Sequence, residues 1–184
     1  MADGDKTSGI RPRATLGRRL DIVARLAFPA SCTVLLMLAA EAPFGIADQA
    51  MLLPAVTFAC IYFWSLYRPT AISPPVVFLI GVLFDLLGYL PLGVGALSLL
   101  VVHGLALRWR RTLARQGFFP VWLAFGGFAA GGAAFQWGLT ALLSFSLLPL
   151  GPAVFQALLT VALYPALAVL FVRAHRSVAD PERA

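Results

Sequence analysis

Charged residues are scarce in this chain. Only 12% of its 184 residues are charged, whereas 60% are hydrophobic and the mean hydropathy is +0.87. A water-soluble domain of ordinary composition carries roughly a quarter charged residues. The shortage therefore excludes an ordinary soluble domain and predicts a protein whose outer surface faces lipid.

Residues that build metal centres and active sites are also few. The two cysteines, Cys32 and Cys60, both lie in apolar runs, where a thiol behaves as a small hydrophobic group. We expect neither a disulfide nor a metal site from them. The chain has no His-Glu-x-x-His, Gly-x-Ser-x-Gly or P-loop pattern. The sequence therefore predicts no enzyme, no metal and no cofactor.

Long apolar runs are abundant instead. About 20 helical residues cross a hydrocarbon core of about 30 Å. The sequence therefore predicts an all-α polytopic membrane protein with six transmembrane helices, flanked by mobile tails at residues 1–20 and 174–184. The expected spans cover residues 22–40, 49–67, 74–90, 92–107, 120–145 and 152–172.

The count of six depends on the residues from Gly88 to Gly95. Pro91 and three glycines in this stretch favour a tight turn over a continuing helix. A re-entrant hairpin at this place would leave five spans.

Basic residues gather in alternate connections. All 14 Lys and Arg residues lie in one of four places: from the N-terminus to the start of the first run, after the second run, after the fourth run, or at the C-terminal end. Six spans put them all on one side, and the positive-inside rule then places both termini in the cytoplasm. The expected basic collar includes Arg18, Arg19, Arg108, Arg110, Arg111 and Arg115.

The same basic residues bear on two other interpretations. A basic start before an apolar run also fits a cleavable signal peptide, but the first run is longer than a signal core, so we expect an uncleaved helix. No soluble segment is long enough to form a folded basic surface for nucleic acid. The expected contact of the collar is the lipid bilayer.

Polar side chains inside a bilayer are costly, and each is a functional hypothesis. Asp85 and His103 would lie at depths about 10 Å apart in antiparallel spans, too far for a hydrogen bond. Gln136 and Gln156 lie at the level of Asp85. We expect these three residues to form a polar cluster that either fixes helix packing or binds a ligand or ion. His103 is expected to be an interfacial or hydrogen-bonded histidine.

Small residues form stripes on two of the runs. Such stripes let helix backbones approach closely in a membrane, where lipid provides no hydrophobic drive for association. We expect packing within the bundle, with a dimer face as the alternative. The glycines concerned are Gly81, Gly88, Gly93, Gly127, Gly131 and Gly138.

Residues 77–93, VFLIGVLFDLLGYLPLG, resemble the signature region of the bacterial rod shape-determining MreD family. In that family a Gly-xxx-Asp-Leu-Leu-x-Gly pattern runs into a Pro-Leu-Gly turn and an apolar helix with a basic end. The matching positions are Gly81, Asp85, Gly88, Gly93 and Arg108–Arg111.

This resemblance implies a non-enzymatic inner-membrane scaffold of the cell-elongation machinery, which organises lateral peptidoglycan synthesis. The implied partners are an MreC-like bitopic protein, an MreB-like cytoskeleton, a RodA-like glycosyltransferase and its penicillin-binding transpeptidase. The family is also similar in topology to the membrane substrate-binding subunits of vitamin-type ABC importers. A small-molecule-binding subunit of a transporter is therefore the alternative function.

Overall fold

The part of the chain that the structure describes is helical throughout. This computed structural model describes residues 16–43, 49–146 and 148–179, with side chains between residues 26 and 173. Each of the six apolar runs coincides with one α-helix, which confirms the predicted all-α fold for these residues. The helices are α1 (Leu16–Glu41), η1 (Gln49–Met51), α2 (Leu52–Tyr67), α3 (Pro74–Leu87), α4 (Val94–Leu113), α5 (Phe118–Ser144) and α6 (Leu150–Ala179).

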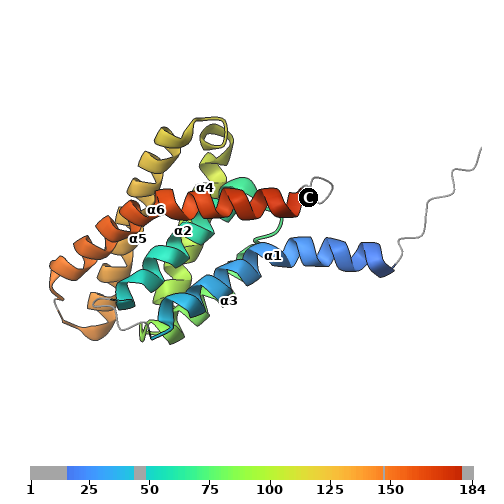
Figure 1. Cartoon of the computed structure of the whole chain (residues 1–184). Helices are drawn as coiled ribbons and strands as arrows, with labels where there is room; N and C mark the ends of the chain where they lie inside the picture. The colour runs from blue at the N-terminus through green and yellow to red at the C-terminus, as the bar shows by residue number, and fades with distance from the viewer. Residues whose placement is uncertain (1–15, 44–48, 147, 180–184) are drawn as a thin grey trace, which may run out of the picture.

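The first and last helices extend beyond the predicted spans. α1 already includes Arg18 and Arg19, whose side chains lie outside the described residues, and α6 continues to Ala179. The predicted tails are therefore helical in part, and residues 1–15 and 180–184 lie outside the described residues. The reason is that hydropathy marks only the apolar part of a helix, whereas arginine and leucine continue it as good helix formers. α1 begins and α6 ends on the same side of the molecule (Figure 1).

Helix α2 forms the centre of the bundle. Every residue from Leu53 to Leu66 is buried, and α1, α4 and α6 pack against this helix. In Figure 1, α2 runs between α1 and α6. The Tyr62 ring contacts Phe125, Phe128 and Tyr164, and its hydroxyl donates to the carbonyl of Val121 at 3.0 Å. A helix that is apolar all round is stable where other helices cover it on every side.

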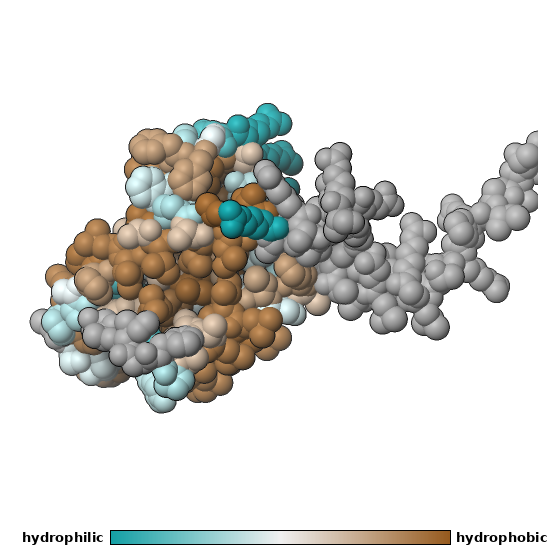
Figure 2. Space-filling view, in the orientation of Figure 1, coloured by the Kyte–Doolittle hydropathy of each residue, from teal (hydrophilic) through white to brown (hydrophobic). Residues whose placement is uncertain are grey.

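The outer surface is apolar. Large side chains such as Leu79, Leu123 and Leu158 are 66%, 67% and 64% exposed. Figure 2 shows hydrophobic residues over most of the visible face, with the hydrophilic ones gathered mainly around the α4–α5 connection. The helical segments Gln49–Tyr67, Phe118–Ser144 and Leu150–Arg173 are each long and apolar enough to cross a membrane. An exposed apolar surface of this extent fits a protein whose solvent is lipid.

Helices α3 and α4 cross at unusually short range. A Cβ added at Gly81 would lie 2.4 Å from the Cα of Ala96, which is backbone and has little freedom to move. Gly81 and Ala96 therefore allow a backbone contact that larger residues would prevent. This confirms the predicted packing role of Gly81.

We expect Gly81→Ala to destabilise the protein by about 1–3 kcal/mol, because the added methyl group forces α3 and α4 apart. The matched control is Gly104→Ala on α4, where an added Cβ meets nothing within 4 Å. Thermal unfolding in detergent, followed by circular dichroism, should show a lower Tm for the first variant and no loss for the second. Equal Tm values would contradict the close crossing.

Candidate functional site

Asp85 lies in the last turn of α3, and its side chain is only 1% exposed. Its carboxylate reaches the beginning of α4. Oδ2 accepts a hydrogen bond from the backbone N–H of Gly93 at 2.8 Å, and Oδ1 accepts one from Gly95 at 2.6 Å. A longer bond of 3.4 Å joins Oδ2 to the N–H of Ala96. We call this arrangement the Asp85 cap.

The Asp85 cap solves a general problem of helices in lipid. The first turn of a helix has N–H groups with no partner inside the helix, and a buried unpaired group is costly away from water. The N–H of Val94 donates to the carbonyl of Pro91 at 3.2 Å. Every backbone N–H from residue 93 to residue 96 thus has an acceptor. The negative charge also faces the positive end of the α4 dipole, which stabilises both.

The glycines of the turn make the cap geometrically possible. Gly93 has φ of +98°, in the left-handed region that favours glycine. A Cβ at Gly95 would lie 2.4 Å from Oδ1 of Asp85 and 2.3 Å from a ring carbon of Phe84. Gly88 follows the last residue of α3, and its N–H donates to the carbonyl of Phe84 at 2.9 Å. Gly88 and Gly93 therefore serve the turn between α3 and α4.

The structure does not join Asp85 to the two glutamines. Both oxygens of Asp85 accept from backbone N–H groups of α4, and Oε1 of Gln136 is buried without a hydrogen-bond partner. The predicted hydrogen bonding among Asp85, Gln136 and Gln156 is therefore not formed. Depth along a helix predicts the level of a side chain, but the direction around the helix axis decides what it meets.

Gln136 and Gln156 instead line one hollow between α5 and α6, which we call the glutamine pocket. Its volume is about 170 Å³. Gln136 is 6% exposed, and Gln156 is half-buried. The remaining lining consists of Leu90, Ala133, Trp137, Thr140, Leu148, Pro149, Pro152 and Ala153.

Within this chain, the glycine stripe of α5 does not make the predicted close contacts, and the alternative of a dimer face stays open. A Cβ at Gly127, Gly131 or Gly138 would meet nothing within 4 Å. The neighbouring Gly132 makes the contact instead, because a Cβ there would lie 2.4 Å from Cε1 of Phe58 on α2. One residue turns a helix by about 100°, so the stripe points away from the core. The Gly131-Gly132 pair was visible in the sequence, but its orientation was not.

His103 and Asp85 have separate partners, which confirms that the two do not pair. Nδ1 of His103 lies 2.7 Å from Oγ of Ser65 on α2, and that hydroxyl donates to the carbonyl of Ile61 at 2.5 Å. A hydroxyl has one proton to donate, so it accepts from His103, whose ring proton is then on Nδ1. Sequence reasoning predicted a hydrogen-bonded histidine and missed Ser65, because serines also occur on helices without such a role.

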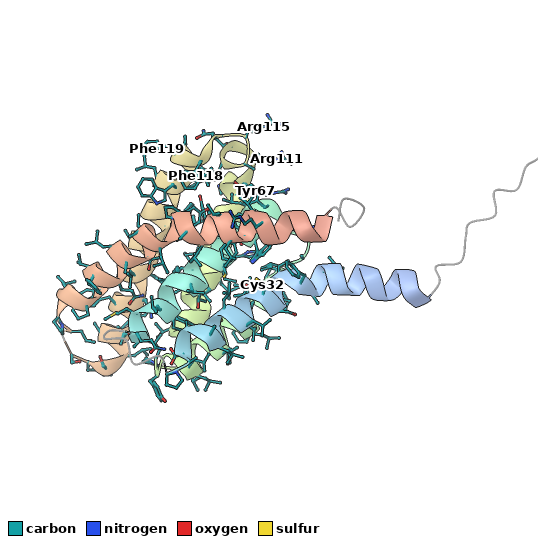
Figure 3. The ribbon with its side chains drawn as sticks, viewed as in Figure 1. Cys32, Tyr67, Arg111, Arg115, Phe118 and Phe119 are labelled. Carbon is teal, nitrogen blue, oxygen red and sulfur yellow. The ribbon has the colours of Figure 1, made fainter. Side chains whose placement is uncertain are left out.

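One end of the molecule combines arginines with aromatic side chains. Nε of Arg110 donates to the carbonyl of Leu66 at 2.9 Å and so ties the end of α4 to the end of α2. The predicted collar members Arg108, Arg110, Arg111 and Arg115 are all exposed here. Figure 3 shows the neighbouring labelled side chains at this end, which are Tyr67, Arg111, Arg115, Phe118 and Phe119.

Comparisons with known proteins return no relatives. No family model, no curated protein and no solved structure matches this chain. Among the described residues, no group of three or more His, Cys, Asp or Glu side chains is placed to hold a metal ion. The features of the molecule that bear on its function are the Asp85 cap, the exposed surfaces and the glutamine pocket.

We expect Asp85→Leu to lower the free energy of unfolding by on the order of 3 kcal/mol, because it leaves buried N–H groups of α4 without acceptors. Asp85→Asn should lose less, since its amide oxygen still accepts. Tm values in detergent should rank wild type above Asn and Asn above Leu.

The control for this series is Ser98→Ala. Ser98 is also buried at the start of α4, but its hydroxyl donates only to its own helix, to the carbonyl of Val94 at 2.7 Å. This variant should have nearly the wild-type Tm. If Asp85→Leu is as stable as Ser98→Ala, the cap does not hold the turn.

Proposed function

We propose that this protein is a non-enzymatic multi-pass scaffold of the bacterial inner membrane that takes part in lateral cell-wall synthesis. The observation that supports the proposal is the Asp85 cap. Gly81, Asp85 and Gly93, which carry the resemblance to the MreD family, are the residues that close α3 onto α4. The motif thus builds the hydrogen-bonded turn between α3 and α4, a structural role that suits a scaffold.

The Asp85 cap also indicates which kind of role this carboxylate has in the protein. Both oxygens of Asp85 are held by backbone N–H groups in a buried site. A carboxylate in this state is poorly placed to transfer protons or bind ions, so its role is structural. The surfaces that α4 and α5 expose then become the places where partners act.

Two surfaces have the chemistry that a scaffold requires. Gly127 and Gly131 are exposed on α5 and line a hollow between α4 and α5, with room for the close approach of another helix. The arginines and aromatic residues at the α4–α5 connection form the second surface, which suits anionic headgroups or an acidic cytoplasmic segment.

The alternative function, a small-molecule-binding subunit of a transporter, has less support. Such a subunit predicts a cavity around Asp85, Gln136 and Gln156, but Asp85 does not line the glutamine pocket.

The proposed topology is six spans with both termini in the cytoplasm. In a variant whose native cysteines are serine, Tyr89→Cys should react with an impermeant maleimide added to intact cells, because Tyr89 is 95% exposed in the α3–α4 turn. Gln116→Cys, in the α4–α5 connection, should react only after permeabilisation. The reverse pattern, or equal labelling at both positions, would contradict this topology.

Copurification from native bacterial membranes tests the scaffold function. An affinity-tagged full chain should recover an MreC-like bitopic protein and a RodA-like glycosyltransferase. Gly131→Leu should reduce this recovery severalfold, because a bulky side chain blocks close helix approach. The control is Gly104→Leu, since Gly104 is also exposed and unobstructed but lies outside the α4–α5 hollow. Recovery of a coupling ATPase without wall-synthesis proteins would refute the proposal.

A further inference from the structure

The glutamine pocket contains a buried hydrogen-bond acceptor with no partner. Oε1 of Gln136 accepts nothing, although the residue is only 6% exposed. A buried amide oxygen without a donor costs free energy, and more so in a medium without water. An unpartnered acceptor of this kind indicates a site that a donor from outside the chain completes.

The other polar groups of the pocket show which chemistry is missing. The Thr140 hydroxyl donates to the carbonyl of Gln136 at 2.9 Å, and the Trp137 ring N–H donates to the carbonyl of Leu148 at 3.2 Å. These two donors are already used. The side-chain amides of Gln136 and Gln156 remain open, and each amide can both accept and donate a hydrogen bond. None of the described residues that line the pocket is charged. The pocket therefore suits an uncharged hydroxyl or amide N–H group.

An apolar groove adjoins the pocket on the same two helices. The two hollows are adjacent, because both are lined by Ala133, Trp137 and Ala153. The groove has a volume of about 480 Å³ and is lined on α6 by residues from Leu150 to Leu158, about 12 Å along the helix axis. On α5, the small residues Ala134 and Gly138 line the groove.

From this juxtaposition we infer that α5 and α6 bind a lipid-like amphiphile. Its uncharged hydroxyl or amide headgroup donates to Gln136 beside Gln156, and its hydrocarbon chain lies in the groove. The position of Gln136 requires a ligand whose small, uncharged headgroup can enter the hydrocarbon layer. Gln136 is eight residues from the end of α5, or about 12 Å at the helical rise. The groove is parallel to the helices, as acyl chains in a bilayer are.

The test uses the full chain in phosphatidylcholine nanodiscs that contain a small fraction of diacylglycerol with a diazirine on one acyl chain. Diacylglycerol offers the hydroxyl donor, and its 3-O-methyl ether, with the same diazirine, cannot donate. After irradiation, mass spectrometry should place the label on residues 130–158. The hydroxyl probe should label roughly three- to tenfold more than the ether, as expected for one buried hydrogen bond. Unlabelled diacylglycerol should compete, and glycerol should not.

Three variants distinguish binding of the ligand's headgroup from binding of its hydrocarbon chain. Gln136→Leu should make the two probes label equally, with no loss of Tm, because it removes an oxygen that has no partner in the protein. Ala134→Phe fills the groove and should reduce labelling by both probes. Ala162→Phe, at another exposed alanine of α6 outside both hollows, should change neither.

Equal labelling of the wild type by both probes, or label spread evenly over the other helices, would overturn the inference. A crosslink from an Ala134→Cys variant to another protein in native membranes would also overturn it, since a partner helix would then occupy the groove.

Discussion

The carboxylate of Asp85 at the beginning of α4 is the interaction on which the rest of the fold depends. Without water, the first N–H groups of a helix need acceptors from the protein itself. One side chain of α3 accepts from Gly93 and Gly95 and more weakly from Ala96. The reach of that side chain is short, so α3 and α4 must cross closely. The short distance between α3 and α4 explains three features of the crossing. Gly93 adopts a left-handed conformation, Gly95 has no Cβ that would collide with Asp85, and Gly81 contacts Ala96.

The same interaction determines where function can reside. An intramembrane carboxylate is ordinarily a candidate for ion or proton chemistry. Here both oxygens of Asp85 accept from backbone N–H groups at the beginning of α4, so the carboxylate serves the structure of the turn. The buried α2 is likewise structural, because it is covered by α1, α4 and α6. On the proposed function, partners contact the outer faces of the bundle. These faces carry the exposed glycines of α5, the arginine-rich end and the hollows between α5 and α6.

Much of the fold was predictable because the signals are local. Apolar runs locate the helices, and Pro91 with its neighbouring glycines locates the turn after α3. The expected depths of Asp85 and His103 in the membrane correctly predicted that the two residues do not form a hydrogen bond. The same expected depths placed Asp85 with Gln136 and Gln156 at one level but did not say which way each side chain points. The stripe of Gly127, Gly131 and Gly138 misled for the same reason, since a helical face can point to the core or to the lipid.

For the residues that the structure describes, the sequence by itself determined six lipid-compatible α-helices, with the basic residues in alternate connections. These properties follow from composition and spacing along the chain. Only the tertiary structure decided that Asp85 caps α4, that Gly132 rather than Gly131 meets α2, and that Gln136 is left with a free acceptor beside an apolar groove. Those outcomes depend on the rotation of each helix about its axis. That rotation is set by the packing of all the helices together and is not encoded in any single segment.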